Sequence, residues 1–126
     1  MPQKEWMISS ILLKDLLHAS KRAHPNEFIA LLSTLERDSL VVGEVVVIPA
    51  ISGRDYAALH SELIPFDPLI VGTVHSHPTP SPYPSSQDLM TFSRMGEFHL
   101  ILAYPYTPSS VRAFNAKGKR IPLRLV

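Results

Sequence analysis

One apolar run constrains the fold of this chain more than any other stretch. It covers residues 69–74, is rich in β-branched side chains and lies between Pro68 and Pro78. A short apolar run bounded by turn-forming residues is typical of a buried strand. We therefore expect a buried strand that runs directly into the segment His75-Ser76-His77.

Polar residues of a kind that bind metals lie at the end of this strand. Side chains two apart on a strand point to the same face, roughly 6.5 Å apart at Cα, so His75 and His77 can converge on one cation. A proline-rich loop, residues 78–84, then leads to Ser85-Ser86-Gln87-Asp88. This segment is typical of a helix start with Ser85 as N-cap, and Asp88 in the first turn can supply a third ligand.

Each of these pieces also occurs in proteins without a metal. A His-x-His pair can be structural, a capping serine with an acidic first turn is common, and prolines can simply stiffen a surface loop. The combination favours a site, because proline lowers the entropy of the loop and holds the helix start near the strand end. The prolines concerned are Pro78, Pro80, Pro82 and Pro84.

The chain has no cysteine, so a transition metal must use histidine and carboxylate ligands. Two histidines and one aspartate around zinc leave a fourth position for water, as in catalytic sites. Hydrolysis also needs a proton carrier. Glu27 opens an otherwise apolar segment, where a carboxylate is either paired or functional, and Glu62 precedes the metal strand. The residues alone leave both acids open as the general base.

Hydrophobic periodicity predicts the other elements of the chain. The segment 27–35 is apolar on both faces, which indicates a central strand, although a helix fits its periodicity too. His18 and His24 lie on or at the end of the first expected helix, and we expect both to be solvated. Residues 56–63 fit either a short strand or a helical turn. We expect strands at 6–9 (at a sheet edge), 27–35, 41–48 and 98–104, a closing hairpin of 111–115 with 120–126 around Lys117-Gly118, and helices at 11–23 and 85–95.

This order of elements indicates an α/β or α+β fold with one sheet and helices packed against it. The 126 residues suit a single domain, residues 1–126. The net charge of +1 argues against a surface that coats nucleic acid. No apolar run approaches the ~18 residues of a membrane span or forms a signal peptide, so we expect a cytoplasmic protein without a membrane partner.

Taken together, His75-Ser76-His77, seven intervening residues, Ser85-x-x-Asp88 and the upstream Glu27 resemble the signature of the JAMM metalloproteases, also called MPN-plus domains. The similarity covers nearly the whole chain, and residues 23–32 and 72–78 resemble the small archaeal members. The resemblance implies a mixed sheet flanked by helices, related in architecture to the cytidine deaminases.

The resemblance also implies roles for the residues of the motif. His75, His77 and Asp88 would bind one zinc ion with a catalytic water, Glu27 would hold that water as general base, and Ser85 would stabilise the tetrahedral intermediate. The implied substrate is an isopeptide or peptide bond at the C-terminal tail of a ubiquitin-like protein, as in a desampylase or deubiquitinase. Because the chain has no room for long insertions, small modifiers or sulfur-carrier proteins are favoured. The oligomeric state stays open.

Two other functions compete with this hypothesis. A non-catalytic MPN scaffold is disfavoured by the intact motif, and a RadC-like DNA-associated protein, which shares part of the motif, by the near-neutral charge. Zinc deaminases are excluded because their cysteine ligands do not exist here, and no His-Glu-x-x-His helix occurs. The basic residues Lys117, Lys119, Arg120 and Arg124 fit a solvated hairpin better than a site for an acidic partner.

Overall fold

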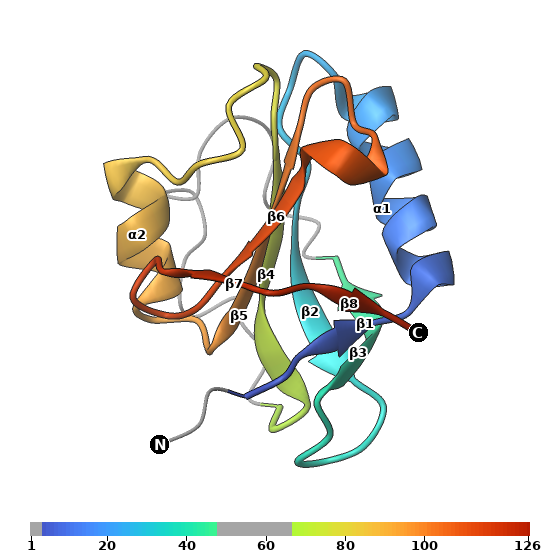
Figure 1. Cartoon of the computed structure of the whole chain (residues 1–126), viewed down its shortest axis with the longest axis vertical. Coiled ribbons are helices and arrows are strands. Elements are labelled where there is room, and N and C mark those ends of the chain that lie inside the picture. Colours follow the sequence, from blue (N-terminus) through green and yellow to red (C-terminus); the bar gives the residue numbers. More distant parts are fainter. Residues whose placement is uncertain (1–3, 48–66) are drawn as a thin grey trace.

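A single mixed sheet of eight strands organises the described part of the chain (Figure 1). The computed structural model describes residues 4–47 and 67–126. The strand order is β7-β6-β5-β4-β2-β3-β1-β8. The elements are β1 (Met7–Ile8), α1 (Ser10–Ala23), β2 (Ile29–Thr34), β3 (Val41–Val46), β4 (Ile70–His77), α2 (Ser86–Phe92), β5 (Phe98–Ala103), the 3₁₀ helix η3 (Pro108–Ser110), β6 (Val111–Phe114), β7 (Arg120–Ile121) and β8 (Arg124–Leu125). The predicted mixed sheet with flanking helices is confirmed.

The sheet curls so that its two ends approach each other. Strands β7 and β8 stand at opposite ends of the strand order, yet only Pro122 and Leu123 separate them in the chain. Strand β4 lies in the interior of the sheet, antiparallel to β2 and parallel to β5. All six residues of β2 are buried, as its apolar sequence predicts for a central strand, and the helical alternative for this segment is wrong.

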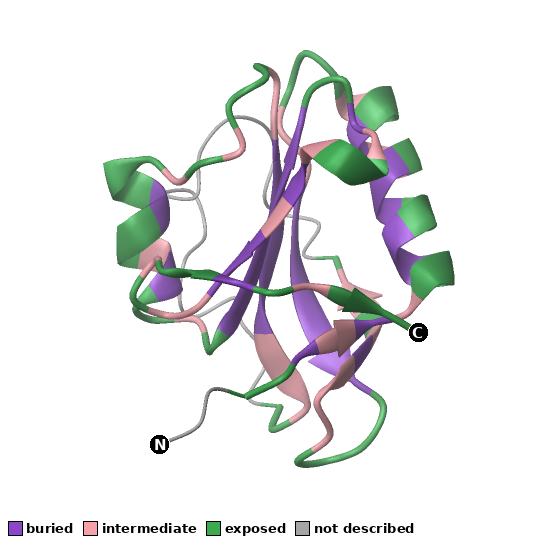
Figure 2. Cartoon of the chain, viewed as in Figure 1, coloured by how far each residue is buried: buried purple, intermediate pink, exposed green. Residues whose placement is uncertain are grey.

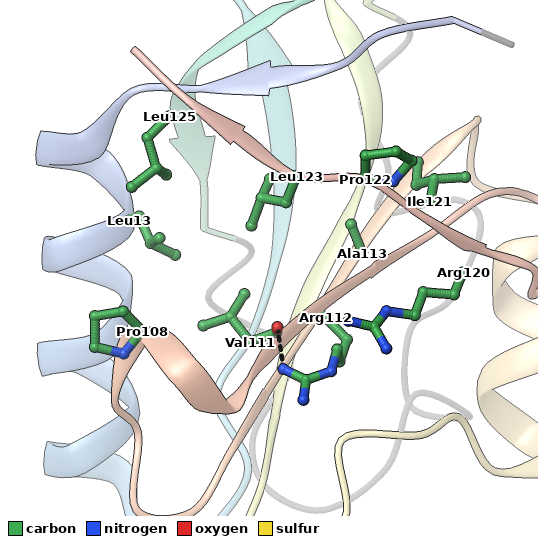
Figure 3. Close-up of a pocket in the computed structure, with 10 residues that line it drawn as sticks. All are labelled: Leu13, Pro108, Val111, Arg112, Ala113, Arg120, Ile121, Pro122, Leu123 and Leu125. Atoms are coloured by element: carbon green, nitrogen blue, oxygen red, sulfur yellow. Dashed lines mark hydrogen bonds between the residues drawn. The ribbon is translucent and has the colours of Figure 1, made fainter.

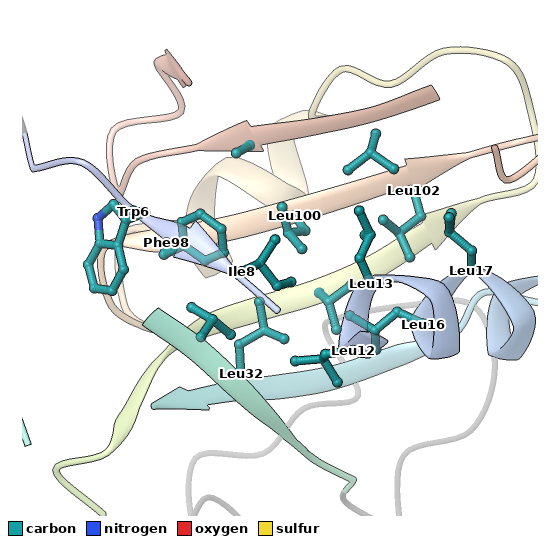
Figure 4. Packing of buried hydrophobic residues seen from close by; sticks show 14 of the residues in the cluster. Trp6, Ile8, Leu12, Leu13, Leu16, Leu17, Leu32, Phe98, Leu100 and Leu102 are labelled. Carbon is teal, nitrogen blue, oxygen red and sulfur yellow. The ribbon is translucent and has the colours of Figure 1, made fainter. Parts of the chain in front are cut away.

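Helix α1 covers one face of the sheet with a stripe of leucines. Ser9 caps the helix by accepting a hydrogen bond from the Leu12 N–H, and His24 is its C-cap before Pro25. The buried side of α1 faces the sheet and its exposed side faces away (Figure 2). Its leucines pack with side chains of β1, β2 and β5 (Figure 4). The labelled members of this cluster are Trp6, Ile8, Leu12, Leu13, Leu16, Leu17, Leu32, Phe98, Leu100 and Leu102.

Helix α2 lies on the other face and is shorter than the sequence predicts. Its buried residues are Asp88 and Phe92, and Phe92 forms a small apolar cluster with Ile101 and Phe114. Leu89, three residues before Phe92 and so expected on the same face of the helix, is 39% exposed, whereas Phe92 is fully buried. The helix ends at Phe92 with Ser93 as its C-cap, and not at Gly96 as the expected range 85–95 implies. Gly96 lies in the turn that follows, where its φ of 109° is a conformation that favours glycine.

The chain termini pair in a way that local sequence patterns do not predict. Strand β1 is not at an edge, because it lies between β3 and β8 and is parallel to both. The predicted hairpin of β6 and β7 is present, with Gly118 at a φ of 79°, but the chain then leaves it. Residues Arg124–Leu125 form β8 at the other end of the sheet. The expectations for residues 56–63, Ile48 and Glu62 lie outside the described residues.

Candidate metal centre

Strand β4 presents two histidines at its C-terminal end, on the α2 face of the sheet. His75 is fully buried and the His77 side chain is 13% exposed. Their rings are neighbours, with centroids 4.7 Å apart, as expected for side chains two apart on one strand. Ser76, between them, points to the opposite face, where its Oγ accepts a hydrogen bond from the Phe28 N–H at 2.7 Å. Ser76 therefore joins strand β4 to the segment before β2 and does not face the two imidazoles.

The start of α2 brings a carboxylate to the same place. Ser85 is the N-cap, and its Oγ accepts a hydrogen bond from the Asp88 N–H at 3.1 Å. In turn, Asp88 Oδ2 accepts a hydrogen bond from the Ser85 N–H at 2.8 Å. This capping box fixes the rotamer of Asp88 through its own helix turn. The carboxylate is therefore held in place before any ligand binds.

The three side chains converge on one point. The Nε2 atom of His75 lies 3.2 Å from Asp88 Oδ1, and that of His77 lies 3.2 Å from Asp88 Oδ2. The two Nε2 atoms are 2.9 Å apart. Potential ligand atoms of all three residues lie within 4.8 Å of one another. Two imidazole nitrogens and one carboxylate oxygen aimed at a common point are the donor set of a catalytic zinc site.

The tautomer of His77 also fits a metal ligand. Its Nδ1 lies 2.9 Å from the carbonyl oxygen of Ser81, which can only accept, so Nδ1 carries the proton and donates it. In the neutral form that binds a metal, the lone pair is then on Nε2, which faces His75 and Asp88. When the ring is protonated instead, the same Nε2 donates to Asp88 Oδ2. A backbone carbonyl that receives the second ring N–H is the usual support of a metal-bound histidine. The donor set and this support fit one zinc ion.

Hydrogen bonds within the cluster set the charges of its members. Burial raises the pKa of Asp88, but hydrogen bonds from His75 and His77 outweigh it and hold this pKa well below its usual range. Burial lowers the pKa of His75. Burial also lowers the pKa of His77, but the hydrogen bonds to Asp88 and Ser81 outweigh this effect. The pKa of His77 is therefore raised. The cluster therefore contains an ionised carboxylate and a neutral buried imidazole at neutral pH.

Glu27 lies beside this cluster, two residues before β2 begins. Strands β2 and β4 are antiparallel, with Ile29 paired to His75, and the Ser76 N–H donates to the Phe28 carbonyl at 2.9 Å. Continuing that register by two residues places Glu27 opposite His77, on the same side of the sheet. In agreement, the negative charge of Glu27 is among the causes that raise the His77 pKa. Glu27 is half-buried and has interacting neighbours.

A buried histidine behind the cluster was not expected from the sequence. His99 Nε2 donates to the Gly96 carbonyl at 2.9 Å, so its Nδ1 accepts from the Thr73 hydroxyl at 2.8 Å. Its ring stacks on Phe92 with centroids 4.3 Å apart. Burial lowers the His99 pKa to about 4. The signal in the sequence is a histidine inside the apolar run 98–104. Its ring contacts Phe92, whose own ring lies 6.2 Å from that of His75.

His24 is exposed, as predicted for a residue at a helix end, but it makes contacts that the sequence did not predict. Its Nδ1 lies 2.8 Å from the Tyr106 hydroxyl. Its ring also packs against Tyr104, with centroids 5.1 Å apart. His18 is exposed as predicted. Among the described residues, the group of side chains placed to bind a metal is therefore His75, His77 and Asp88.

A cavity of about 540 Å³ lies apart from this cluster, between α1 and strands β6 to β8 (Figure 3). Its apolar lining includes Leu13, Val111 and Leu123, and Arg112 and Arg120 lie at its border. None of the clustered metal-binding side chains lines it. Within the described residues, no helix has the length and apolar character needed to cross a membrane.

Comparison with known proteins links this geometry to one family. The family described as prokaryotic homologs of the JAB domain matches residues 9–117. A protein of Haloferax volcanii described as a probable metalloprotease is 37% identical over 120 residues, which cover 89% of this chain and 74% of that protein.

Solved structures agree with this match. A structure described as a JAMM metalloprotease-like zinc site in the proteasome and signalosome has 39% identity and a TM-score of 0.76, covering 98% of this chain and 99% of that one. A JAB1/MPN domain protein from Archaeoglobus fulgidus has 38% identity and a TM-score of 0.75, with 98% and 100% covered. A protein of Desulfitobacterium hafniense, 20% identical with a TM-score of 0.64, covering 97% of this chain and 93% of that one, shares the fold. The chain therefore belongs to the prokaryotic JAB family of JAMM domain metalloproteases.

Proposed function

We propose that this protein is a zinc-dependent hydrolase that cleaves isopeptide or peptide bonds at the C-terminal tail of small ubiquitin-like modifier or sulfur-carrier proteins. His75, His77 and Asp88 are the proposed zinc ligands. The observation that carries the proposal is the convergence of these three side chains within 4.8 Å, beside Glu27. The description of the Haloferax volcanii relative as a probable metalloprotease supports the same reaction class.

Glu27 is the proposed general base. Zinc bound at the three ligands would act as a Lewis acid on the scissile carbonyl and would make a water acidic enough to react near neutral pH. The Glu27 carboxylate takes the proton of that water and passes it to the leaving amine. Its expected position opposite His77, on the same side of the sheet, supports this role.

Ser85 is the proposed group that stabilises the oxyanion. Its Oγ accepts a hydrogen bond from the Asp88 N–H, which uses a lone pair and leaves the hydroxyl proton available. Ser85 is exposed, so this proton can reach a substrate beside Asp88. A single donor of this kind contributes roughly 10²-fold to 10³-fold in turnover. The same residue can therefore cap the helix and stabilise the developing charge.

The exposure of the cluster supports a flexible, narrow substrate segment. The side chains of His77 and Asp88 are 13% and 8% exposed, so the centre opens to solvent over a small area. An extended tail of small residues, such as the end of a ubiquitin-like protein, can enter such a site without displacing the fold. We propose no nucleic acid or membrane partner. The proposed setting is a single catalytic domain, residues 1–126, in the cytoplasm.

The experiment that tests this function replaces Glu27 by Gln and measures zinc content together with cleavage of modifier fusions. Glu27→Gln keeps the size of the side chain but removes its basicity, so we expect unchanged zinc and a turnover lower by about 10²-fold to 10⁴-fold. A chelator should abolish wild-type cleavage. Persisting turnover in Glu27→Gln contradicts the role of Glu27, and a zinc-loaded wild type that cleaves no fusion indicates the non-catalytic scaffold instead.

A further inference from the structure

The segment that carries Glu27, residues 24–28, is attached to the fold at both of its ends. At the C-terminal end, Phe28 exchanges two hydrogen bonds with Ser76 of β4. At the N-terminal end, His24 caps α1, and its Nδ1 lies 2.8 Å from the Tyr106 hydroxyl. Glu27 stands between these two attachments. These two attachments therefore define the path of the short segment that carries the carboxylate.

Tyr106 is held more rigidly than its place in a connecting segment suggests. It is 2% exposed, belongs to the large apolar cluster on the α1 face, and its N–H donates to the Ala103 carbonyl at 2.8 Å. Its φ of 64° lies in the left-handed region, which bulky side chains rarely adopt. Backbone conformations of this kind concentrate where the fold must place a side chain for function.

The hydroxyl of Tyr106 is also within electrostatic reach of Glu27. Burial raises the pKa of Tyr106, and the charges of Tyr104 and Glu27 raise it further. The hydroxyl therefore stays protonated near neutral pH. It can keep one hydrogen bond to His24 while the neighbouring carboxylate gains and loses a proton.

We propose that Tyr106 is a positioning residue whose hydroxyl, through His24, fixes the segment 24–28 and so sets the place of the Glu27 carboxylate. This inference rests on the proposed role of Glu27 as general base. The ring of Tyr106 serves the apolar core, and the hydroxyl serves the site. The two functions of one side chain can therefore be separated by removing a single oxygen atom.

The test is a set of four variants compared with the wild type. Tyr106→Phe removes only the hydroxyl. His24→Gln places its amide near the position of Nε2 and loses the contact, whereas His24→Asn places its amide near Nδ1 and can restore it. Tyr104→Phe is the matched control, because Tyr104 is the adjacent tyrosine and is 44% exposed. Each variant is measured for kcat and KM on a modifier fusion, for bound zinc, and for amide hydrogen exchange in the metal-free protein.

We expect Tyr106→Phe and His24→Gln to lower kcat by about tenfold, with KM and zinc content unchanged. In the same two variants the amides of Glu27 and Phe28 should exchange faster, while those in the middle of α1 do not. His24→Asn and Tyr104→Phe should keep kcat within about threefold of the wild type.

Three results would overturn the proposal: full kcat in Tyr106→Phe, a loss in His24→Asn as large as in His24→Gln, or a loss of zinc that parallels the loss of kcat. If the wild type cleaves none of the fusions, the proposed function has failed, and hydrogen exchange then decides the inference alone. Unchanged exchange at Glu27 and Phe28 in Tyr106→Phe would show that the hydroxyl does not hold the segment.

Discussion

The two faces of the sheet have opposite contents, although the same strands build both. On the α1 face, apolar side chains from α1 and seven strands form one continuous cluster. On the α2 face, the apolar cluster consists of Phe92, Ile101 and Phe114. Buried polar side chains accompany it, among them Thr73, His75, Asp88 and His99.

This difference shows how the fold separates stability from chemistry. In β4, Val74 belongs to the α1-side cluster, and the next residue, His75, belongs to the metal centre on the other side. Burying polar groups costs free energy unless they are hydrogen-bonded, and here each is held by a neighbour. The α1 face supplies the apolar burial that lets the α2 face carry these groups. The predictions below test that division.

The largest expected effect on stability is on the α1 face. Leu16 is 1% exposed, so Leu16→Ala should lower the free energy of unfolding by about 2 to 5 kcal/mol, through lost burial and a cavity. Urea denaturation measures this loss, and zinc content should stay unchanged in the folded protein. Ile11→Ala is the matched control, because Ile11 on the same helix is 73% exposed. Equal losses of stability in both variants, or a loss of zinc in Leu16→Ala, would contradict the division between a stabilising α1 face and a metal-binding α2 face.

The next largest expected effect is a dependence of stability on pH, caused by His99 on the α2 face. The folded-state pKa of His99 is about 4, against 6.5 for an ordinary histidine. The unfolded chain therefore binds the proton first as pH falls below 6.5, so stability decreases from there down to about pH 4. The expected loss at pH 5 is about 2 kcal/mol relative to pH 7.5. His99→Gln should be less stable at pH 7.5 and should lack this part of the slope in denaturation curves. A slope equal to that of the wild type would refute the assignment.

A smaller effect is expected from the loss of the hydrogen bond between the Phe28 N–H and the Ser76 hydroxyl. Ser76→Ala leaves the Phe28 N–H without its acceptor, which should cost about 1 to 2 kcal/mol. Because that bond also anchors the segment that carries Glu27, turnover should fall while zinc is kept. Thermal unfolding and steady-state kinetics measure the two consequences. An unchanged turnover would show that this anchor does not affect the site.

The smallest effect is expected in the proline-rich loop. Ser81, whose carbonyl accepts the His77 Nδ1–H, stands between Pro80 and Pro82. Pro82→Gly gives the loop more freedom in the unfolded chain and should cost about 0.4 to 1 kcal/mol. The same freedom should weaken the support of His77 and lower zinc affinity, measured by competition with a chelator. Unchanged affinity would leave the prolines without a role in the centre.

Local patterns in the sequence predict much of the candidate site. The spacing of His75 and His77 on a strand and the capping box of Ser85 and Asp88 involve neighbours in the chain, so their geometry follows from element type alone. Glu27 is noticeable because an acid begins an apolar segment.

Contacts between distant segments are the part that could not be predicted. The position of β1 depends on its pairing with β8 across the whole chain, which no local pattern encodes. Phe92 packs with Ile101 and Phe114 from distant strands, whereas Leu89, three residues earlier on the same helix, is exposed. The contact of His24 with Tyr106 joins residues 82 positions apart.

The central claim is that the α2 face is a zinc site made by His75, His77 and Asp88, and metal analysis of Asp88→Asn tests it most directly. Asparagine can still accept the Ser85 N–H at the helix cap, but it lacks the charge of the carboxylate. Elemental analysis after dialysis should give about one zinc per wild-type chain and far less for Asp88→Asn, with both proteins folded. A wild type without zinc, or an Asp88→Asn variant that retains it fully, would contradict the account.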